Sequence, residues 1–257
     1  MASLRMPEPV EDKKVAIVGG GPTGIAAAYF LGREGVPTTI FERERKLGGV
    51  PRYVIPAFRI SDEAIDKDVA LMERLGVEVK CGAPAPSVAE LKKMGYTHIL
   101  MATGAWKPGK LDIEGNVQGV IEWMKRMKKQ VKPCLSGNIV VVGAGNTAMD
   151  AARVAKRLAG VKNVRLVYRR TKKQMPADEE ELDLALADGV EFCELLAPKA
   201  LNGAVLTCDV MELGEPDASG RRSPVATGET VELPATTVIC AVGEGIDASL
   251  YLSLIHI

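Results

Sequence analysis

The same order of elements occurs twice in this chain, and that repeat most strongly limits how the chain can fold. The first copy begins with an apolar strand over residues 14–18, which runs directly into Gly19-Gly20-Gly21. Apolar residues then recur at helical spacing over residues 23–33, and a second strand follows over residues 38–41. These lengths make a β-α-β unit of about 30 residues, the size that dinucleotide-binding domains use.

The second copy has a strand over residues 139–142 that runs into Gly143-Ala144-Gly145. The pattern then predicts a helix over residues 147–158 and another strand over residues 164–168. Strands that alternate with helices in this way form parallel sheets. We therefore expect an α/β protein with two Rossmann-like dinucleotide-binding domains.

The first glycine motif is G-x-G-x-x-G, and each glycine in it has a physical task. Gly19 allows a tight turn, Gly21 lets the backbone approach a pyrophosphate, and Gly24 lets the helix pack closely on the strand. Glu42 ends the next strand, where a carboxylate accepts both hydroxyls of an adenosine ribose and repels a 2′-phosphate. The alternative is a glycine turn with a surface glutamate.

The segment after Glu42 favours FAD over NAD as the ligand of the first motif. A second glycine pair, Gly48-Gly49, lets the backbone lie against a flavin or its phosphates; an ordinary basic surface loop is the alternative. The candidate FAD-binding residues are Gly19, Gly21, Pro22, Thr23, Gly24, Glu42, Arg43, Gly48, Gly49, Arg52, Pro56, Arg59, Thr103 and Gly104.

The second motif has the same spacing but ends in alanine, and a different strand end follows it. Arg169-Arg170 stand where a ribose-binding carboxylate would be, and two guanidinium groups can bind a 2′-phosphate. A solvated basic turn is the alternative. Asn146 and Thr147 could contact phosphate or cap the helix. The candidate NADPH-binding residues are Gly143, Gly145, Asn146, Thr147, Ala148, Arg169 and Arg170.

Two further patterns concern the ends of the units. The apolar runs at residues 99–104 and 238–243 both end in glycine, so each is interpreted as a late strand of its unit or as a crossing between domains. Short apolar stretches over residues 190–237, split by a polar turn at residues 214–222, predict an antiparallel patch on the second domain.

Composition excludes several classes of partner and site. Lys+Arg and Asp+Glu both number 33, so no net basic field attracts nucleic acid or an anionic membrane. None of the five cysteines matches a C-x-x-C, zinc or iron–sulfur spacing, and two histidines leave no room for a histidine-based metal site or triad. We find no signal peptide and no apolar run near the roughly 20 residues that span a bilayer. We expect a cytoplasmic protein with buried thiols.

Four motifs in order resemble those of the NADPH-dependent glutamate synthase small-subunit family. That family includes the flavin part of dihydropyrimidine dehydrogenase, bifurcating ferredoxin:NADP oxidoreductases and selenate-reductase FAD subunits, to which residues 103–108 look closest. The resemblance covers residues 13–251. The motifs are residues 18–24 (VGGGPTG), 48–59 (GGVPRYVIPAFR), 143–150 (GAGNTAMD) and 167–170 (VYRR).

The resemblance implies an NADPH domain inserted into an FAD domain. Residues 1–112 would form the first segment of the FAD domain, residues 113–235 the NADPH domain, and residues 236–257 a truncated return to the FAD domain. Hydride would pass from NADPH to FAD, and electrons would continue to an iron–sulfur domain or subunit and a catalytic partner subunit. The cofactors supply this chemistry, so we nominate no acid–base, nucleophilic or metal-binding side chain.

The chain also departs from the family pattern. It has no cysteine-rich segment before residue 19 and no strand ending in Gly-Asp after residue 251, and residues 252–257 do not continue the pattern. We therefore expect a fragment that binds NADPH and holds FAD weakly. The alternatives are an NADPH-binding module without turnover and a thioredoxin-reductase-like or monooxygenase-like flavoenzyme. A thioredoxin reductase would need the C-x-x-C that this sequence lacks.

Overall fold

The computed structural model describes residues 7–129, 135–218, 220 and 222–247. The chain divides into two compact units, Met1–Ala105 and Trp106–Ile257, which we call unit 1 and unit 2. This division lies seven residues before the expected end of the first segment at residue 112. The segment after Ala105 belongs to unit 2 because its short strands pair only with strands of that unit.

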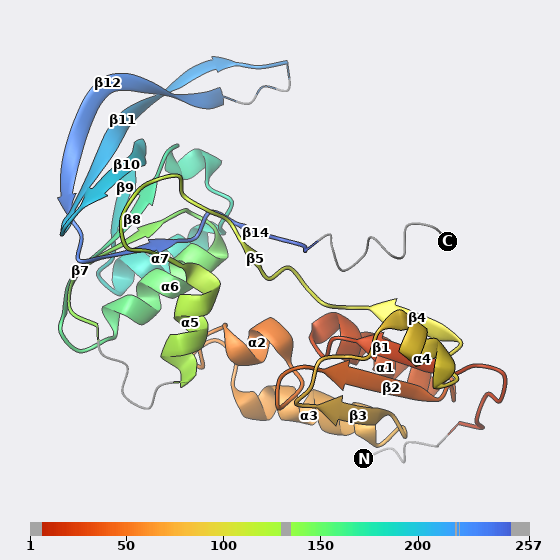
Figure 1. Ribbon diagram of the computed structural model, residues 1–257. Helices are drawn as coiled ribbons and strands as arrows, with labels where there is room; N and C mark the ends of the chain where they lie inside the picture. The colour runs from red at the N-terminus through yellow and green to blue at the C-terminus, as the bar shows by residue number, and fades with distance from the viewer. Residues whose placement is uncertain (1–6, 130–134, 219, 221, 248–257) are drawn as a thin grey trace. The chain divides into compact units, whose positions relative to one another are not determined.

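Unit 1 contains a four-stranded parallel sheet in the order β3-β2-β1-β4 (Figure 1). Its strands are β1 (Val15–Val18), β2 (Thr38–Glu42), β3 (Glu78–Cys81) and β4 (His98–Met101). Its helices are α1 (Pro22–Arg33), α2 (Gly49–Tyr53), α3 (Asp62–Glu73) and α4 (Val88–Lys93). The strands expected over residues 14–18 and 38–41 and the helix expected over residues 23–33 are present, and the short helix α2 begins at the second glycine pair.

The core of unit 1 lies on both faces of this sheet. Ile17 and Ile40 pack with Ala28 of α1 and Met72 of α3. On the other face, Phe41 packs with residues from α4 and the turn after it. Every residue of β2 is buried because neighbouring elements cover both faces.

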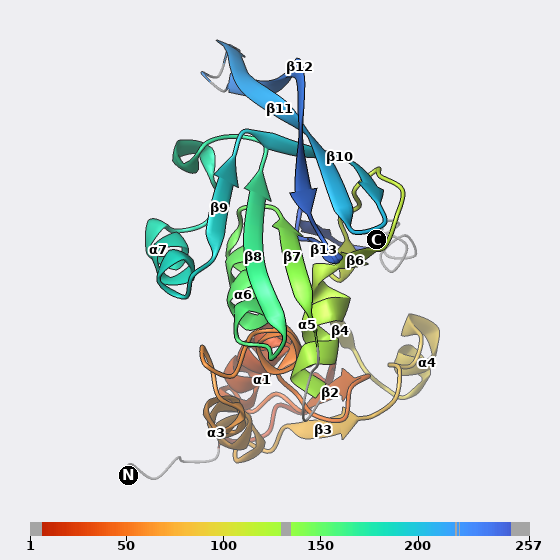
Figure 2. The ribbon, with the colours of Figure 1, turned by 90° about the vertical axis from the view of Figure 1, so that its left-hand side faces the viewer.

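Unit 2 repeats this arrangement with a five-stranded parallel sheet in the order β6-β13-β7-β8-β9, most of which Figure 2 shows side by side. Its strands are β6 (Val117–Gly119), β7 (Gly137–Val142), β8 (Val161–Tyr168), β9 (Glu191–Glu194) and β13 (Thr237–Cys240). Its helices are α5 (Val120–Lys129), α6 (Asn146–Lys156), the short 3₁₀ helix η1 (Lys172–Gln174) and α7 (Glu179–Ala187).

A second, antiparallel sheet decorates unit 2, as the sequence predicted. It has the order β10-β11-β12 and consists of β10 (Leu196–Asn202), β11 (Val205–Pro216) and β12 (Arg222–Pro234). Leu201, Leu206 and Cys208 of this sheet pack on valines of the parallel sheet. The antiparallel sheet thereby covers one face of the parallel sheet.

Strand β13 corrects one expected boundary. Residues 236–257 were expected to return to the first domain, but β13 pairs in parallel with β7 on one side and β6 on the other. The error arose because an apolar strand ending in glycine has the same pattern wherever it lies. After β13, β14 (Glu244–Gly245) pairs antiparallel with β5 (Lys107–Pro108), and residues 248–257 lie outside the described residues.

Candidate dinucleotide-binding sites

The first glycine loop, Gly19–Gly21, joins β1 to α1 and has no room for side chains. Gly19 has φ +107°, and its N–H donates to the Phe41 carbonyl at 2.9 Å. A Cβ on Gly19 would lie 2.3 Å from the Ala102 carbonyl oxygen, and one on Gly24 would lie 2.0 Å from the Gly19 oxygen. Both contacts are with backbone, so these two positions require glycine.

Helix α1 begins without a side-chain cap, unlike α3, the other long helix of unit 1. Gly21 is the N-cap of α1, its first turn contains no acidic residue, and Pro22 and Thr23 are exposed there. In α3, by contrast, the Ser61 hydroxyl accepts from the Ala64 N–H. An uncapped helix N-terminus at a glycine loop is suited to bind phosphate.

The second glycine pair packs directly on this loop. The Gly48 N–H donates to the Gly20 carbonyl at 2.7 Å. Gly49 has φ +54°, and a Cβ on it would lie 2.8 Å from the Gly21 Cα. The two segments therefore meet backbone to backbone, which leaves a surface that an extended cofactor can approach closely.

Glu42 ends β2 beside the first glycine loop and is 7% exposed. Its Oε2 accepts from the Gly20 N–H at 2.7 Å, and its Oε1 accepts from the Glu44 N–H at 2.8 Å. Each carboxylate oxygen has a further lone pair, so both remain able to accept a ribose hydroxyl. The backbone contacts fix the orientation of the carboxylate.

Arg52 has partners within its own unit. It is 4% exposed, its Nε donates to the Leu47 carbonyl, and its Nη2 lies 2.5 Å from Asp66 Oδ1. Its Nη1 lies 3.5 Å from Asp62 Oδ2. Through these contacts, Arg52 connects the loop that precedes α2 with helix α3. The sequence predicted Arg52 only as a cofactor-binding residue and did not indicate this structural role.

The remaining candidates of unit 1 surround these loops. Arg43 and Arg59 are exposed, Pro56 is buried, and the Pro56 carbonyl accepts from the Arg59 N–H at 3.0 Å. Thr103 is half-buried, and Gly104 has φ +72°. Both follow β4, whose end lies against Gly19.

The second glycine loop, Gly143–Gly145, has the same geometry as the first. Gly143 has φ +133°, its N–H donates to the Val167 carbonyl at 3.0 Å, and a Cβ on it would lie 2.2 Å from the Ala241 oxygen. Helix α6 begins without a side-chain cap or an acidic residue in its first turn. Ala148 is fully buried there and Thr147 is half-buried.

Arg169 and Arg170 follow β8 directly, one and two residues beyond Tyr168, which matches Glu42 at the end of β2. Arg169 is exposed and Arg170 is half-buried. The Nε of Arg170 is buried and has no hydrogen-bond partner among the described residues. A buried cationic donor without a partner fits a site for an anionic group such as a phosphate.

A corner between β9 and β10 supports this arginine turn, and no sequence pattern pointed to it. Leu195 has φ +55°, which is unusual for a residue other than glycine. Its N–H donates to the Arg170 carbonyl at 3.1 Å. The Glu194 carboxylate accepts from the Lys172 N–H. The backbone on both sides of Thr171 is therefore fixed from β9 and β10.

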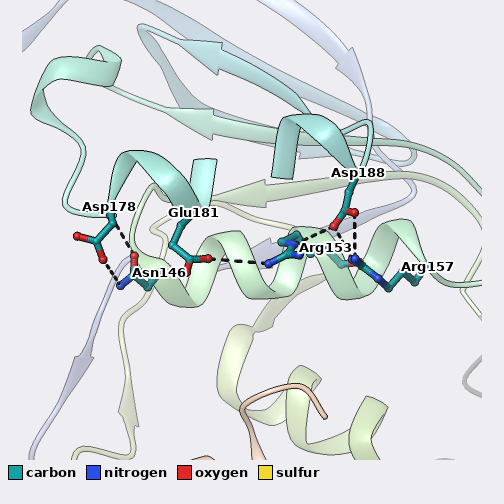
Figure 3. Close-up of polar contacts among 6 residues, drawn as sticks. All are labelled: Asn146, Arg153, Arg157, Asp178, Glu181 and Asp188. Atoms are coloured by element: carbon teal, nitrogen blue, oxygen red, sulfur yellow. Dashed lines mark hydrogen bonds and ion pairs between the residues drawn. The ribbon is translucent and has the colours of Figure 1, made fainter. Parts of the chain in front are cut away.

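The side chain of Asn146 forms its observed hydrogen bonds with Asp178, at the start of α7. Its Nδ2 donates to Asp178 Oδ2 at 3.4 Å, and its Oδ1 accepts from the Asp178 N–H at 3.3 Å (Figure 3). The helix cap that the sequence allowed for Asn146 is occupied by Gly145 instead.

The described residues contain no group of three or more potential metal ligands. Four cysteines are described and all are free thiols, and Cys134 lies outside the described residues. Burial raises the pKa of Cys208 to about 12, with smaller contributions from Cys193 and Asp209. No helix within the described ranges is long and apolar enough to cross a membrane.

Two Rossmann-like units, with glycine loops at the carboxyl ends of β1 and β7, define an α/β protein with two dinucleotide-binding folds. Comparison with known families agrees with this class. Residues 13–254 match the model of the pyridine nucleotide-disulphide oxidoreductase family. The chain belongs to that family.

Individual relatives are larger than this chain. It is 45% identical over 235 residues to the Escherichia coli (strain K12) protein YgfK, named as an oxidoreductase, covering 90% of this chain and 23% of YgfK. It is 31% identical over 255 residues to the glutamate synthase [NADPH] small chain of the same organism, covering 90% of this chain and 54% of that one. The chain thus spans about a quarter to a half of these relatives.

A solved structure shows the same fold. FprA of Mycobacterium tuberculosis, in complex with NADPH, matches with a TM-score of 0.75 and 22% identity. The match covers 90% of this chain and 71% of FprA.

Proposed function

We propose that this chain is the dinucleotide-binding part of an FAD-dependent NADPH oxidoreductase, with FAD held by unit 1 and NADPH by unit 2. One observation carries this assignment. At the end of the strand that follows each glycine loop and its helix, unit 1 has the buried carboxylate of Glu42, whereas unit 2 has Tyr168 followed by Arg169-Arg170. A carboxylate accepts ribose hydroxyls, and guanidinium groups bind a 2′-phosphate.

The residues present fit both groups. In unit 1, Gly21 and Gly49 offer a backbone surface to the FAD pyrophosphate, and Glu42 orients the adenosine ribose. In unit 2, the second glycine loop faces the NADPH pyrophosphate and Arg170 donates to the 2′-phosphate. When bound, the two cofactors supply hydride transfer, and the protein binds and orients them.

We further propose that unit 2 is inserted in the FAD domain. The support is the antiparallel pairing of β14 with β5, because the chain after β13 runs back along the segment by which it left unit 1. On this proposal, the boundaries near residues 112 and 236 move to Ala105 and beyond Cys240.

We place an iron–sulfur domain or subunit and a catalytic partner subunit downstream of the flavin. A partner subunit is supported by a relative, 37% identical over 263 residues, that is named NADPH-Fe(3+) oxidoreductase subunit beta in Geobacter sulfurreducens, whereas the iron–sulfur group rests on the family resemblance alone. The match covers 95% of this chain and 39% of that protein. Four free thiols among the described cysteines favour a reducing compartment such as the cytoplasm.

The test is the double substitution Arg169→Ala and Arg170→Ala. We expect the unaltered chain to bind NADPH more tightly than NADH in isothermal titration calorimetry. The double variant should lose about 30-fold or more in NADPH affinity, since charge-assisted hydrogen bonds are lost, and change little toward NADH. Equal losses for both nucleotides would contradict the 2′-phosphate assignment. Lys162→Ala, an exposed cation near the start of β8, is the matched control.

A further inference from the structure

The segment that follows the arginine turn folds back onto the second glycine loop. This segment, residues 171–178, runs from the turn through η1 to the start of α7. The Ala177 N–H donates to the Ala144 carbonyl at 3.0 Å, and Ala177 is buried. The place for a Cβ on Gly145 is 3.9 Å from Pro176 Cγ. One short segment therefore connects the two groups of residues assigned to NADPH.

Asn146 and Asp178 join this segment to α6 by two hydrogen bonds. Asn146 is the first residue of α6, and Asp178 is the N-cap of α7. Aspartate at an N-cap usually accepts from the first turn of its own helix. The Asp178 side chain makes no such bond and instead accepts from Asn146 Nδ2, as Figure 3 shows. Both polar groups of Asn146 are thus directed to Asp178.

Ion pairs farther along α6 and α7 hold the two helices together next to the Asn146–Asp178 pair. Arg153 Nε donates to Asp188 at 2.8 Å, and Arg153 Nη1 lies 3.9 Å from Glu181 Oε2. Arg157 Nη1 lies 2.6 Å from the same Asp188 carboxylate. These ion pairs hold the helices together along their length, so Asn146 and Asp178 fix the end nearest the second glycine loop (Figure 3).

We propose that Asn146 and Asp178 are positioning residues that determine selectivity for NADPH over NADH. They hold the arginine turn at a set distance from the second glycine loop, so that one ligand can reach both. This inference rests on the proposed function of unit 2. NADPH must bind its pyrophosphate and its 2′-phosphate at once, whereas NADH uses only the loop. Loosening the connection therefore weakens NADPH more than NADH.

The experiment compares Asn146→Ala, Asp178→Ala and the double variant in the complete chain, titrated calorimetrically with NADPH and with NADH. Asn146→Ala removes both hydrogen bonds and should weaken NADPH about fivefold, the size of a typical net hydrogen bond. Asp178→Ala removes only the bond to its carboxylate and should weaken NADPH about threefold, and both variants should leave NADH within about twofold. The double variant should be no weaker than Asn146→Ala, because that substitution already removes both hydrogen bonds.

Two further variants separate positioning from charge and from stability. Asp178→Asn keeps an acceptor for Asn146 and should retain the NADPH preference. Glu180→Ala removes the same charge from the first turn of α7 without changing the pair, so it should bind both nucleotides as the unaltered chain does.

The outcomes that overturn the inference differ from those that overturn the proposed function. If Asn146→Ala weakens both nucleotides equally while Asp178→Ala has no effect, Asn146 contacts the pyrophosphate directly and the inference is wrong. The inference is also wrong if both variants keep the full preference while the Arg169/Arg170 double variant loses it. A chain that never prefers NADPH overturns the proposed function, and this inference with it.

Discussion

The two glycine loops of this protein are built alike where they meet the sheet. Gly19 and Gly143 both have positive φ, and both lie so close to an alanine carbonyl, of Ala102 and Ala241, that no Cβ fits. Those alanines directly follow β4 and β13, which occupy equivalent places beside β1 and β7, the strands that lead into the two glycine loops. The similarity between the apolar runs at residues 99–104 and 238–243 thus has a structural cause, since each run packs against a glycine loop.

The loops differ at the third position of the motif. A Cβ on Gly24 would lie 2.0 Å from the Gly19 oxygen, whereas unit 2 accommodates the Ala148 methyl group fully buried. Helix α6 therefore begins farther from its loop than α1 does. The first two glycines of the motif therefore determine the path of the loop, whereas the third residue determines how closely the helix packs on that loop.

Replacing Gly24 by alanine and Ala148 by glycine should give the largest difference in stability between the two units. Gly24→Ala is expected to destabilise unit 1 by about 3 kcal/mol, because the methyl group meets backbone that cannot move aside. Ala148→Gly should cost only about 1 kcal/mol, the difference in helix propensity. Hydrogen exchange followed by mass spectrometry, read separately for peptides of each unit, measures both effects. Equal effects at the two positions would show that the loops have the same spacing.

The arginines near the two loops also differ. Arg52 in unit 1 is buried and donates to the Leu47 carbonyl and to Asp66, and its buried Nη1 makes no hydrogen bond among the described residues but lies 3.5 Å from the Asp62 carboxylate. Arg170 in unit 2 has a buried Nε with no hydrogen-bond partner among the described residues. The same residue type therefore holds a loop in place in one unit and is available to a ligand in the other.

Arg52→Met should accordingly affect stability rather than nucleotide selectivity. We expect unit 1 to lose about 2 kcal/mol, because the Leu47 carbonyl and two partly exposed carboxylates lose their donor. The Arg169/Arg170 double variant should leave the stability of both units within about 0.5 kcal/mol. Hydrogen exchange of peptides covering residues 47–66 reports the loss. A variant with unchanged exchange would return Arg52 to the group of ligand-contacting candidates.

Sequence patterns predicted the parts of this fold that local chemistry determines. The glycine motifs, the strands before them and the helices after them depend on residues within about 30 positions. Helix α3 has a similarly local start signal, because the hydroxyl of Ser61, just before the helix, accepts from the Ala64 N–H. The same locality explains why the opposite charges at Glu42 and Arg169-Arg170 are recognisable from the sequence alone.

The parts that the sequence did not predict depend on partners far away in the chain. Asn146 is 32 residues from Asp178, and the Leu195 corner reaches back to Arg170. Strand β13 was assigned to the wrong domain because its pairing with β7 joins residues about a hundred positions apart. Periodicity describes which face a residue presents, and it does not say which distant group that face will meet.

A last difference concerns how each unit holds the helix after its glycine loop. Helix α1 packs through apolar residues such as Ala28. Helix α6 is also tied to α7 through Asp188, whose carboxylate accepts from Arg153 and Arg157. Burial acts to raise the pKa of Asp188, but the hydrogen bonds from the two arginines outweigh it and lower that pKa below its ordinary value. Unit 2 should therefore be the more acid-sensitive of the two at this helix.

Asp188→Asn tests this difference and should have the smallest effect of the three. A lowered pKa in the folded state adds stability that is present above the unfolded pKa of about 3.9 and is lost as pH falls through the folded value. At pH 7 the variant should lose about 1 kcal/mol in unit 2, and the loss should shrink below about pH 4. Glu180→Asn, an exposed acid on α7, is the control. A deficit that is the same at pH 3 and pH 7, measured by hydrogen exchange, would assign the effect to packing instead of charge.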